Sequence, residues 1–231
     1  MPRSMQPSAW TQWTPFGRGV VFALASTSIA CLLAQFYGLG SMRAVTLFVM
    51  LPALGSLALI AAWDGLRGDG LLCRGVAIGT AAGLIAALAY DLFRLPFVFA
   101  DTWGIGSIVP RLDLFKVFPR FGVMILGEPA GSPLSRPAHA IGWAYHFSNG
   151  ATFGVMYVAL LGEGARRAWS WGVLWAVGLE LGMLLTPYSS VFGIHVATAF
   201  VVVTLLAHLV FGAVLGLLAR RMAHLWPTTG S

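Results

Sequence analysis

The chain is a succession of apolar runs separated by short polar segments. Runs of about 20 apolar residues are long enough to cross the hydrocarbon core of a bilayer as helices. Six such runs occur, at residues 17–38, 44–63, 75–99, 138–161, 168–187 and 191–219. The pattern therefore predicts an all-α polytopic membrane protein built as a bundle of six transmembrane helices.

The segments around these runs are short, with one exception. Residues 1–16 and 222–231 form two tails, so the membrane domain of residues 17–221 leaves no room for a soluble domain. Residues 100–137 form the one long loop, in which apolar and charged residues alternate before an apolar GVMIL at 122–126. We expect this loop to lie along the membrane surface. A re-entrant segment is the alternative, because GVMIL is too short to span.

Composition supports this assignment and narrows the partners. The chain is 58% hydrophobic and 10% charged, whereas soluble domains are about a quarter charged. Its net charge of +6 comes from basic residues scattered at the ends of the runs, which is typical of membrane topology rather than of nucleic-acid binding. The expected partner is the lipid bilayer, with other membrane subunits or a homo-oligomer as open alternatives. Cys31 and Cys73 lie in no CxxC motif, and we expect no disulfide.

The arginines predict the orientation. With six spans both termini lie on one side of the membrane, and paired arginines mark each segment exposed there: Arg3, Arg18, Arg67, Arg74, Arg166, Arg167, Arg220 and Arg221. Basic residues accumulate on the cytoplasmic side. We therefore expect cytoplasmic termini and an external 100–137 loop.

Glycines recur at intervals of four within the runs. Gly75, Gly79 and Gly83 form one stripe, and the later runs carry the pairs Gly150/Gly154, Gly178/Gly182 and Gly212/Gly216. Small residues at this spacing lie on one face of a helix and let a second helix approach closely. We expect each pair to mark a helix contact.

Polar and ionisable side chains interrupt the apolar runs. At ~100° per residue, His139, His146 and Tyr157 share one face of their helix. A charge deep in lipid is costly, so such groups should face the bundle interior and find partners. The candidate binding or permeation residues, most of them near the outer helix ends, are Asp91, Arg94, His146, Asn149, Tyr157, Glu180 and His195. For Glu180 the expected partners are Arg94, His146 and His195.

Three uses of this cluster compete. The side chains could only hydrogen-bond across helices, could form a site for a small solute, ion or proton, or could hold a metal ion or a single haem. The metal ligands would be His139, His146, Glu180 and His195, and a haem would lie between His146 and His195. The sole lysine, Lys116, lies in a loop, which excludes a retinal-type Schiff base.

The sequence contains no HExxH, P-loop or GxSxG motif, so we expect binding or permeation rather than catalysis. The working hypothesis is a small-solute, ion or proton binding or permeation protein with its polar cluster near the outer face. A metal- or haem-binding redox protein and a structural subunit of a larger membrane complex are the alternatives.

Residues 75–220 resemble the small bacterial inner-membrane proteins of the YagU type. The resemblance rests on GLIA at 83–86, on His146 followed by Tyr157, and on AHLVF at 207–211. It implies a bacterial inner-membrane location and a role in envelope or acid stress, and it transfers no catalytic residue. The first two runs would be an N-terminal addition to that family's pattern.

Overall fold

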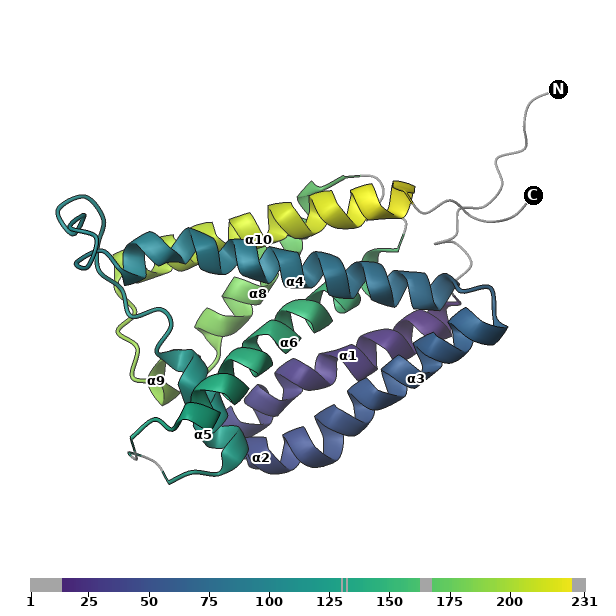
Figure 1. Ribbon diagram of the computed structural model, residues 1–231, viewed down its shortest axis with the longest axis horizontal. Helices are drawn as coiled ribbons and strands as arrows, with labels where there is room; N and C mark the ends of the chain where they lie inside the picture. Colours follow the sequence, from purple (N-terminus) through teal and green to yellow (C-terminus); the bar gives the residue numbers. More distant parts are fainter. Residues whose placement is uncertain (1–13, 130, 132, 163–167, 226–231) are drawn as a thin grey trace.

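The computed structural model describes residues 14–129, 131, 133–162 and 168–225, and these residues form helices joined by turns, with no strand among them. The helices are α1 (Pro15–Phe36), α2 (Met42–Val45), a π-helical turn (Thr46–Met50), α3 (Leu51–Arg67), α4 (Leu71–Val98), α5 (Val117–Leu126), α6 (Arg136–Leu161), α8 (Ser170–Leu185), α9 (Tyr188–Val191) and α10 (Thr198–Leu225) (Figure 1). The predicted all-α class is confirmed.

Four helical segments are long and apolar enough to cross a bilayer: Pro15–Phe36, Met42–Arg67, Leu71–Val98 and Thr198–Leu225. The segment Met42–Arg67 includes the π-helical turn, which lies just before Pro52. The proline ring leaves the nitrogen of Pro52 without a proton, so one backbone hydrogen bond of the helix is missing there. Helix α6 has 26 residues but is less apolar, and α8 has only 16. The structure thus supports a membrane protein with four candidate spans, and the predicted count of six is not confirmed.

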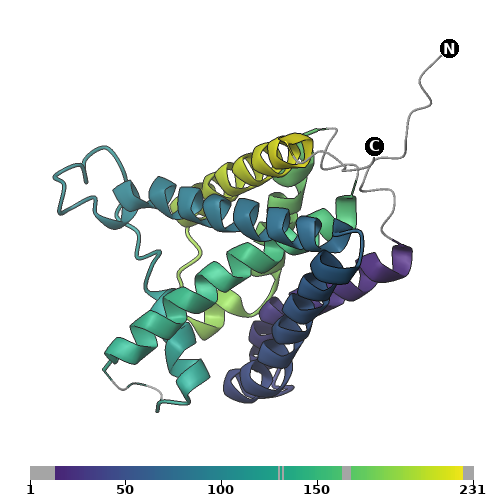
Figure 2. The same cartoon turned by 45° about the vertical axis from the view of Figure 1, so that its right-hand side comes forward.

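The long helices run between two ends of the molecule. The first turn of α1 and the last turn of α10 lie at one end, together with the turn that joins α3 to α4 (Figure 1). Helices α5 and α9 and the 99–116 connection lie at the opposite end. Helix α6 packs against α4, α1 and α5, and α10 packs against α4 and α8 (Figure 2). The predicted tails lie mostly outside the described residues, as do Arg3, Arg166 and Arg167.

Local sequence fixes where α1 and α6 begin. The side chain of Thr14 accepts a hydrogen bond from the backbone N–H of Gly17, and that of Ser135 accepts one from Ala138. Each N-cap satisfies a donor that the first helical turn leaves unpaired. A proline near the start of both helices supplies a preorganised φ angle.

A glycine seam joins α4 to α6. A Cβ added to Gly83 would lie 2.1 Å from the carbonyl oxygen of Gly150, and one added to Gly154 would lie 2.0 Å from that of Gly79. Both distances are far inside van der Waals contact, so the two backbones approach more closely than any side chain at these positions would permit. The predicted contact face of Gly79, Gly83, Gly150 and Gly154 is confirmed.

A second seam joins α8 to α10, but with a different glycine on α8. A Cβ on Gly172 would lie 2.2 Å from the carbonyl oxygen of Gly212, and a Cβ on Gly216 would lie 2.2 Å from that of Trp169. The prediction for Gly212 and Gly216 is confirmed, whereas that for Gly178 and Gly182 is wrong. Both face open space, with no atom within 4 Å of an added Cβ.

The long loop contains a packed helix. Residues Val117, Phe118, Pro119, Phe121 and Gly122 of α5 are buried. A Cβ on Gly122 would lie 1.8 Å from the carbonyl oxygen of Ala138 in α6. The first half of α5 therefore packs against the protein at the end of the bundle, and the position of this loop along the membrane surface stays a prediction.

The last helix begins later than the apolar run suggests. The run was expected to become helical at residue 191, but α10 starts at Thr198 and residues 192–197 form a turn. Gly193 adopts a positive φ of 60° there, a conformation that favours glycine and ends a helix. This turn moves His195 out of the bundle.

Candidate functional site

One polar cluster is built around Asp91 of α4. Its Oδ1 accepts a hydrogen bond from the guanidinium of Arg94, three residues on, and its Oδ2 lies 2.9 Å from Nε2 of His146 in α6. A carboxylate only accepts hydrogen bonds, so Nε2 of His146 carries the proton. Asp91 and Arg94 have side chains only 8% and 4% exposed, which makes this a buried pair with both charges compensated.

A second cluster joins α8 to α10 through Glu180. The hydroxyl of Thr204 donates a hydrogen bond of 2.6 Å to Oε1 of Glu180. Nδ1 of His208 lies 2.8 Å from Oε2 and 2.9 Å from the backbone carbonyl oxygen of Thr204. The hydrogen bond of this nitrogen goes to the carbonyl, so His208 carries a proton on Nδ1, while Oε2 of Glu180 lies beside it without a hydrogen bond among the described residues. Glu180 is only 1% exposed.

Aromatic rings connect the two clusters. Tyr90 lies between them, with its ring centroid 4.9 Å from that of His208 and 6.3 Å from that of His146. The guanidinium carbon of Arg94 lies 4.0 Å from the centre of the Tyr90 ring, a cation–π distance. Phe118 of α5 stacks on His146 with centroids 4.0 Å apart. Both histidines are thus held by a carboxylate at a nitrogen and by a ring.

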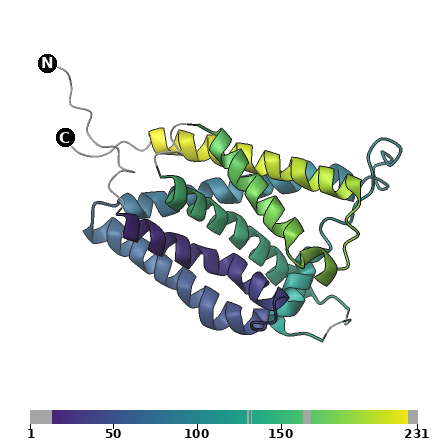
Figure 3. The same cartoon turned by 180° about the vertical axis from the view of Figure 1, so that it is seen from behind.

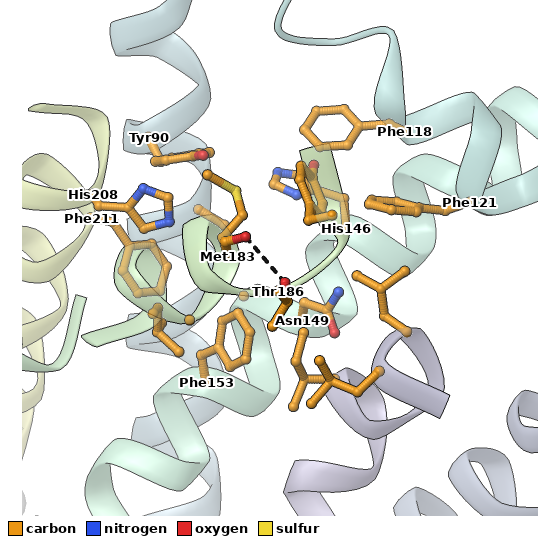
Figure 4. Close-up of a pocket in the computed structure, with 18 of the residues that line it drawn as sticks. Tyr90, Phe118, Phe121, His146, Asn149, Phe153, Met183, Thr186, His208 and Phe211 are labelled. Carbon is orange, nitrogen blue, oxygen red and sulfur yellow. Dashed lines mark hydrogen bonds between the residues drawn. The ribbon is translucent and has the colours of Figure 1, made fainter. Parts of the chain in front are cut away.

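Both clusters border one cavity within the bundle, here called the inner cavity, of about 270 Å³. In Figure 4, His208 with Tyr90 and His146 stand on opposite sides of it, with Met183 between them and Asn149 below His146. The remaining lining is largely apolar. The inner cavity is lined by Ile29, Leu32, Leu33, Phe36, Ala87, Tyr90, Arg94, Phe118, Phe121, His146, Asn149, Gly150, Phe153, Gly178, Leu179, Gly182, Met183, Thr186, Tyr188, His208 and Phe211.

A second cavity, here called the vestibule, lies beside it toward the 99–116 connection and has a volume of about 430 Å³. Its lining contains several basic side chains from that connection and from α5. The vestibule is lined by Tyr90, Arg94, Arg111, Leu112, Asp113, Leu114, Lys116, Val117, Arg120, Met183, Tyr188, Phe192, Gly193, Ile194, His195, Ala197, Phe200 and Thr204.

The structure brings together most of the candidate residues. Asp91, Arg94 and His146 are in mutual contact, Asn149 lines the inner cavity, and Glu180 belongs to the second cluster. Tyr157 does not join them. It is fully buried in the apolar core, among residues such as Val158 and Leu215, and its hydroxyl has no hydrogen-bond partner among the described residues.

The predicted partner of Glu180 is corrected. His195 lies exposed on the 192–197 turn, and the histidine beside Glu180 is His208. His208 takes the place of the predicted His195 because α10 starts late. A residue before Thr198 cannot reach a carboxylate buried between two helices. Arg94 and His146 contact Asp91 instead.

The proposed metal ligands do not assemble. His139 and His195 are exposed, while His146 and Glu180 belong to different clusters. No group of three or more His, Cys, Asp or Glu side chains that could hold a metal ion occurs within the part of the chain that the structure describes. A single haem between His146 and His195 also lacks its second inward-facing ligand, since His195 lies on an exposed turn.

His208 could have been found from the glycines. In the structure Gly172 opposes Gly212 across antiparallel helices. Moving eight residues along α8 from Gly172 to Glu180 matches moving eight residues back along α10 from Gly212 to Thr204, and His208 lies halfway along that path on the same face. Pairing Gly172 rather than Gly178 with α10 would have identified both partners of Glu180.

One family matches the chain: residues 73–228, about two thirds of it, match the family described as "Family of unknown function (DUF6789)". The chain belongs to the DUF6789 family. No curated protein and no solved structure gives a significant match. The DUF6789 region contains both polar clusters, while α1 and α3 precede it. The resemblance to YagU-type proteins stays a prediction, because the matched family has no assigned activity.

Proposed function

We propose that this chain is a six-span inner-membrane protein that binds a small solute or ion, or relays protons, at the two carboxylate–histidine clusters and passes its cargo through the vestibule. In this arrangement α6 and α8 are the fourth and fifth spans, with α8 crossing α10 obliquely and lying in front of it in the view of Figure 3. The vestibule end of the bundle faces outward, because Arg18, Arg67, Arg74, Arg220 and Arg221 lie toward the opposite end.

The observation that carries the proposal is the convergence of both clusters on one cavity. If these side chains only hydrogen-bonded one helix to another, neutral side chains would be sufficient, and the helices would pack without a cavity between them. Here two carboxylates and one arginine are buried, and both histidines border the inner cavity. Ionisable groups inside a membrane protein are costly and mark pathways or sites.

A solute screen with matched variants tests this proposal. We expect at least one compound in a panel of small acids, amines, sugars and monovalent salts to raise the melting temperature of the protein in lipid nanodiscs, since a ligand at ~100 times its Kd stabilises by about 2.7 kcal/mol. Glu180→Gln keeps the shape and the Thr204 contact but loses the charge. It should melt close to wild type and lose the ligand-induced shift.

The control is Glu128→Gln, the same chemical change at a residue that belongs to neither polar cluster and accepts a hydrogen bond from Ser135. It should keep the full shift. A Glu180→Gln protein that responds to every compound as wild type does would reduce the cluster to a helix contact and overturn the proposal.

A further inference from the structure

The two cavities share one wall. Tyr90, Arg94, Met183 and Tyr188 line both the inner cavity and the vestibule, and we call these four residues the neck. On one side of the neck the lining contains exposed basic residues, and on the other it is apolar beyond the histidines. An unbranched methionine is well suited to a movable barrier between them.

The vestibule has a basic surplus. Most of its cations face carboxylates: Arg111 lies 2.9 Å from Asp101 and 3.3 Å from Asp113, which also binds Lys116. Arg120 differs from them. Its guanidinium donates to the backbone carbonyl of Phe192, and it makes no ion pair among the described residues.

The neck itself holds an unsatisfied cationic donor. Arg94 uses one guanidinium nitrogen on Asp91, while its buried Nε–H has no hydrogen-bond partner within the described ranges. A buried donor without a partner is destabilising, and an oxyanion is the partner that a guanidinium binds best. This Nε–H has no accessible surface and Arg94 is already paired with Asp91, so the cation that marks the vestibule side of the neck as a place for one negative charge is Arg120.

The inner cavity offers space for an apolar chain. Ile29 and Leu33 of α1 line one side, and Gly178 and Gly182 of α8 line another. No atom lies within 4 Å of a Cβ added to either glycine, so α8 presents a smooth open surface there. Its volume of about 270 Å³ is near the lower limit for a ligand pocket, which suits a medium-length chain.

We infer that the molecule bound by this protein is an anionic amphiphile, with one carboxylate or phosphate head at Arg120 on the vestibule side of the neck and its apolar chain in the inner cavity. This inference rests on the proposed function and names its substrate class. The head enters from the vestibule or belongs to a lipid of the surrounding bilayer. Both sources share the same chemistry, a single oxyanion joined to a hydrocarbon chain.

Decanoate binding to the full chain in phosphatidylcholine nanodiscs tests the inference, with empty nanodiscs subtracted. We expect saturable binding of decanoate, with decanol, which lacks the charge, and acetate, which lacks the chain, each weaker by roughly tenfold or more. Decyl phosphate should compete with decanoate. Phosphatidylglycerol nanodiscs weaken decanoate binding if the occupant is a bilayer lipid, and leave it unchanged if the occupant is a free amphiphile.

Two pairs of variants separate head from chain. Arg120→Gln should weaken decanoate binding roughly tenfold while Arg120→Lys keeps most of it, at matched melting temperatures. Gly182→Leu should fill the cavity and abolish binding without loss of stability, because its side chain meets open space. Gly55→Leu is the control, since Gly55 is equally open but lines neither cavity.

Equal affinity for decanoate and decanol, equal affinity for acetate, or unchanged decanoate binding in Gly182→Leu would each overturn the inference. So would the absence of saturable decanoate binding. The proposed function fails separately: a cationic or neutral solute whose effect depends on Glu180 would keep that function and reject the amphiphile, whereas no solute dependence on Glu180 would reject the function itself.

Discussion

Asp91 is the residue on which most of the buried charge depends. It holds Arg94 through one oxygen and His146 through the other, so a single carboxylate compensates a full positive charge and fixes a ring. Arg94 also lies over the rings of Tyr90 and Phe115, at 4.0 and 4.9 Å. Removing Asp91 would leave this guanidinium among aromatic rings without an anion.

We therefore predict that Asp91→Asn is strongly destabilising, by about 3–5 kcal/mol, because an uncompensated buried charge is worse than no charge. The double variant Asp91→Asn with Arg94→Met should recover most of that loss, since an apolar side chain of similar length replaces the arginine. Unfolding of the purified variants, followed by circular dichroism, gives both values. An Asp91→Asn protein as stable as wild type would mean that water already solvates Arg94.

At this scale the sequence correctly predicted Asp91, Arg94, His146 and Glu180 as inward-facing, whereas His139 is exposed, and it did not predict every pairing. Asp91 and Arg94 were readable as a local pair because they lie three apart on one helix. The contact between Glu180 and His208 could not be predicted in this way, because it depends on the register of two helices and on where α10 begins. His195 lies in the same apolar run as His208, and only the turn at 192–197 excludes His195 as the partner of Glu180.

The elements pack by two means, glycine seams and interhelical hydrogen bonds. The seams hold α4 to α6 and α8 to α10. Helix α1 is attached to α6 by hydrogen bonds instead: the hydroxyl of Tyr145 donates to the carbonyl of Ser28 at 2.6 Å, and the hydroxyls of Ser28 and Thr152 are 2.6 Å apart. The inner cavity lies where α1 and α8 face each other without a seam.

Substitutions in the seams should unfold the pair that they join. In Gly79→Leu the first added carbon already lies 2.6 Å from the Cα of Val155 and 2.8 Å from the carbonyl of Gly154, so the backbones must separate. We expect a loss of at least ~1–3 kcal/mol, the usual effect of overpacking, seen as a lower melting temperature. Gly154→Leu should behave alike, and Gly55→Leu should melt as wild type does.

A normal melting temperature for both Gly79→Leu and Gly154→Leu would contradict the close α4–α6 contact. Spacing alone predicted this contact correctly and predicted Gly178 and Gly182 wrongly. A stripe of small residues shows where a helix could approach, while the presence of a neighbour depends on how α8 is tilted (Figure 3). The tilt follows from packing and is not encoded in the interval between glycines.

At the scale of the whole molecule the two ends differ in charge arrangement. Near the first turn of α1 and the last turn of α10 lie Arg18, Arg220 and Arg221. At the opposite end Arg111 and Lys116 pair with acids, and the carboxylate of Asp101 raises the pKa of the exposed Arg111. Basic residues close to the ends of membrane spans orient a chain more strongly than charges in a long loop.

We predict that Ser107 faces outward and His224 inward. In a background of Cys31→Ala and Cys73→Ala, Ser107→Cys should react with a membrane-impermeant maleimide on intact cells, and His224→Cys should react only after permeabilisation. Both positions are exposed, so access to the reagent reports the side of the membrane rather than burial. Labelling of His224→Cys on intact cells would reverse the orientation.

The contrast between the two kinds of glycine extends to mutational tolerance. At Gly83, Gly150 and Gly154 even alanine is sterically forbidden, so substitutions at these positions are selected against because they disturb the fold. At Gly178 and Gly182 every small side chain fits, and folding alone gives no reason to keep glycine. Depletion of alanine and larger residues at these two positions, in a saturation mutagenesis experiment selected for activity, would measure directly how much of the space beside α8 the cargo occupies.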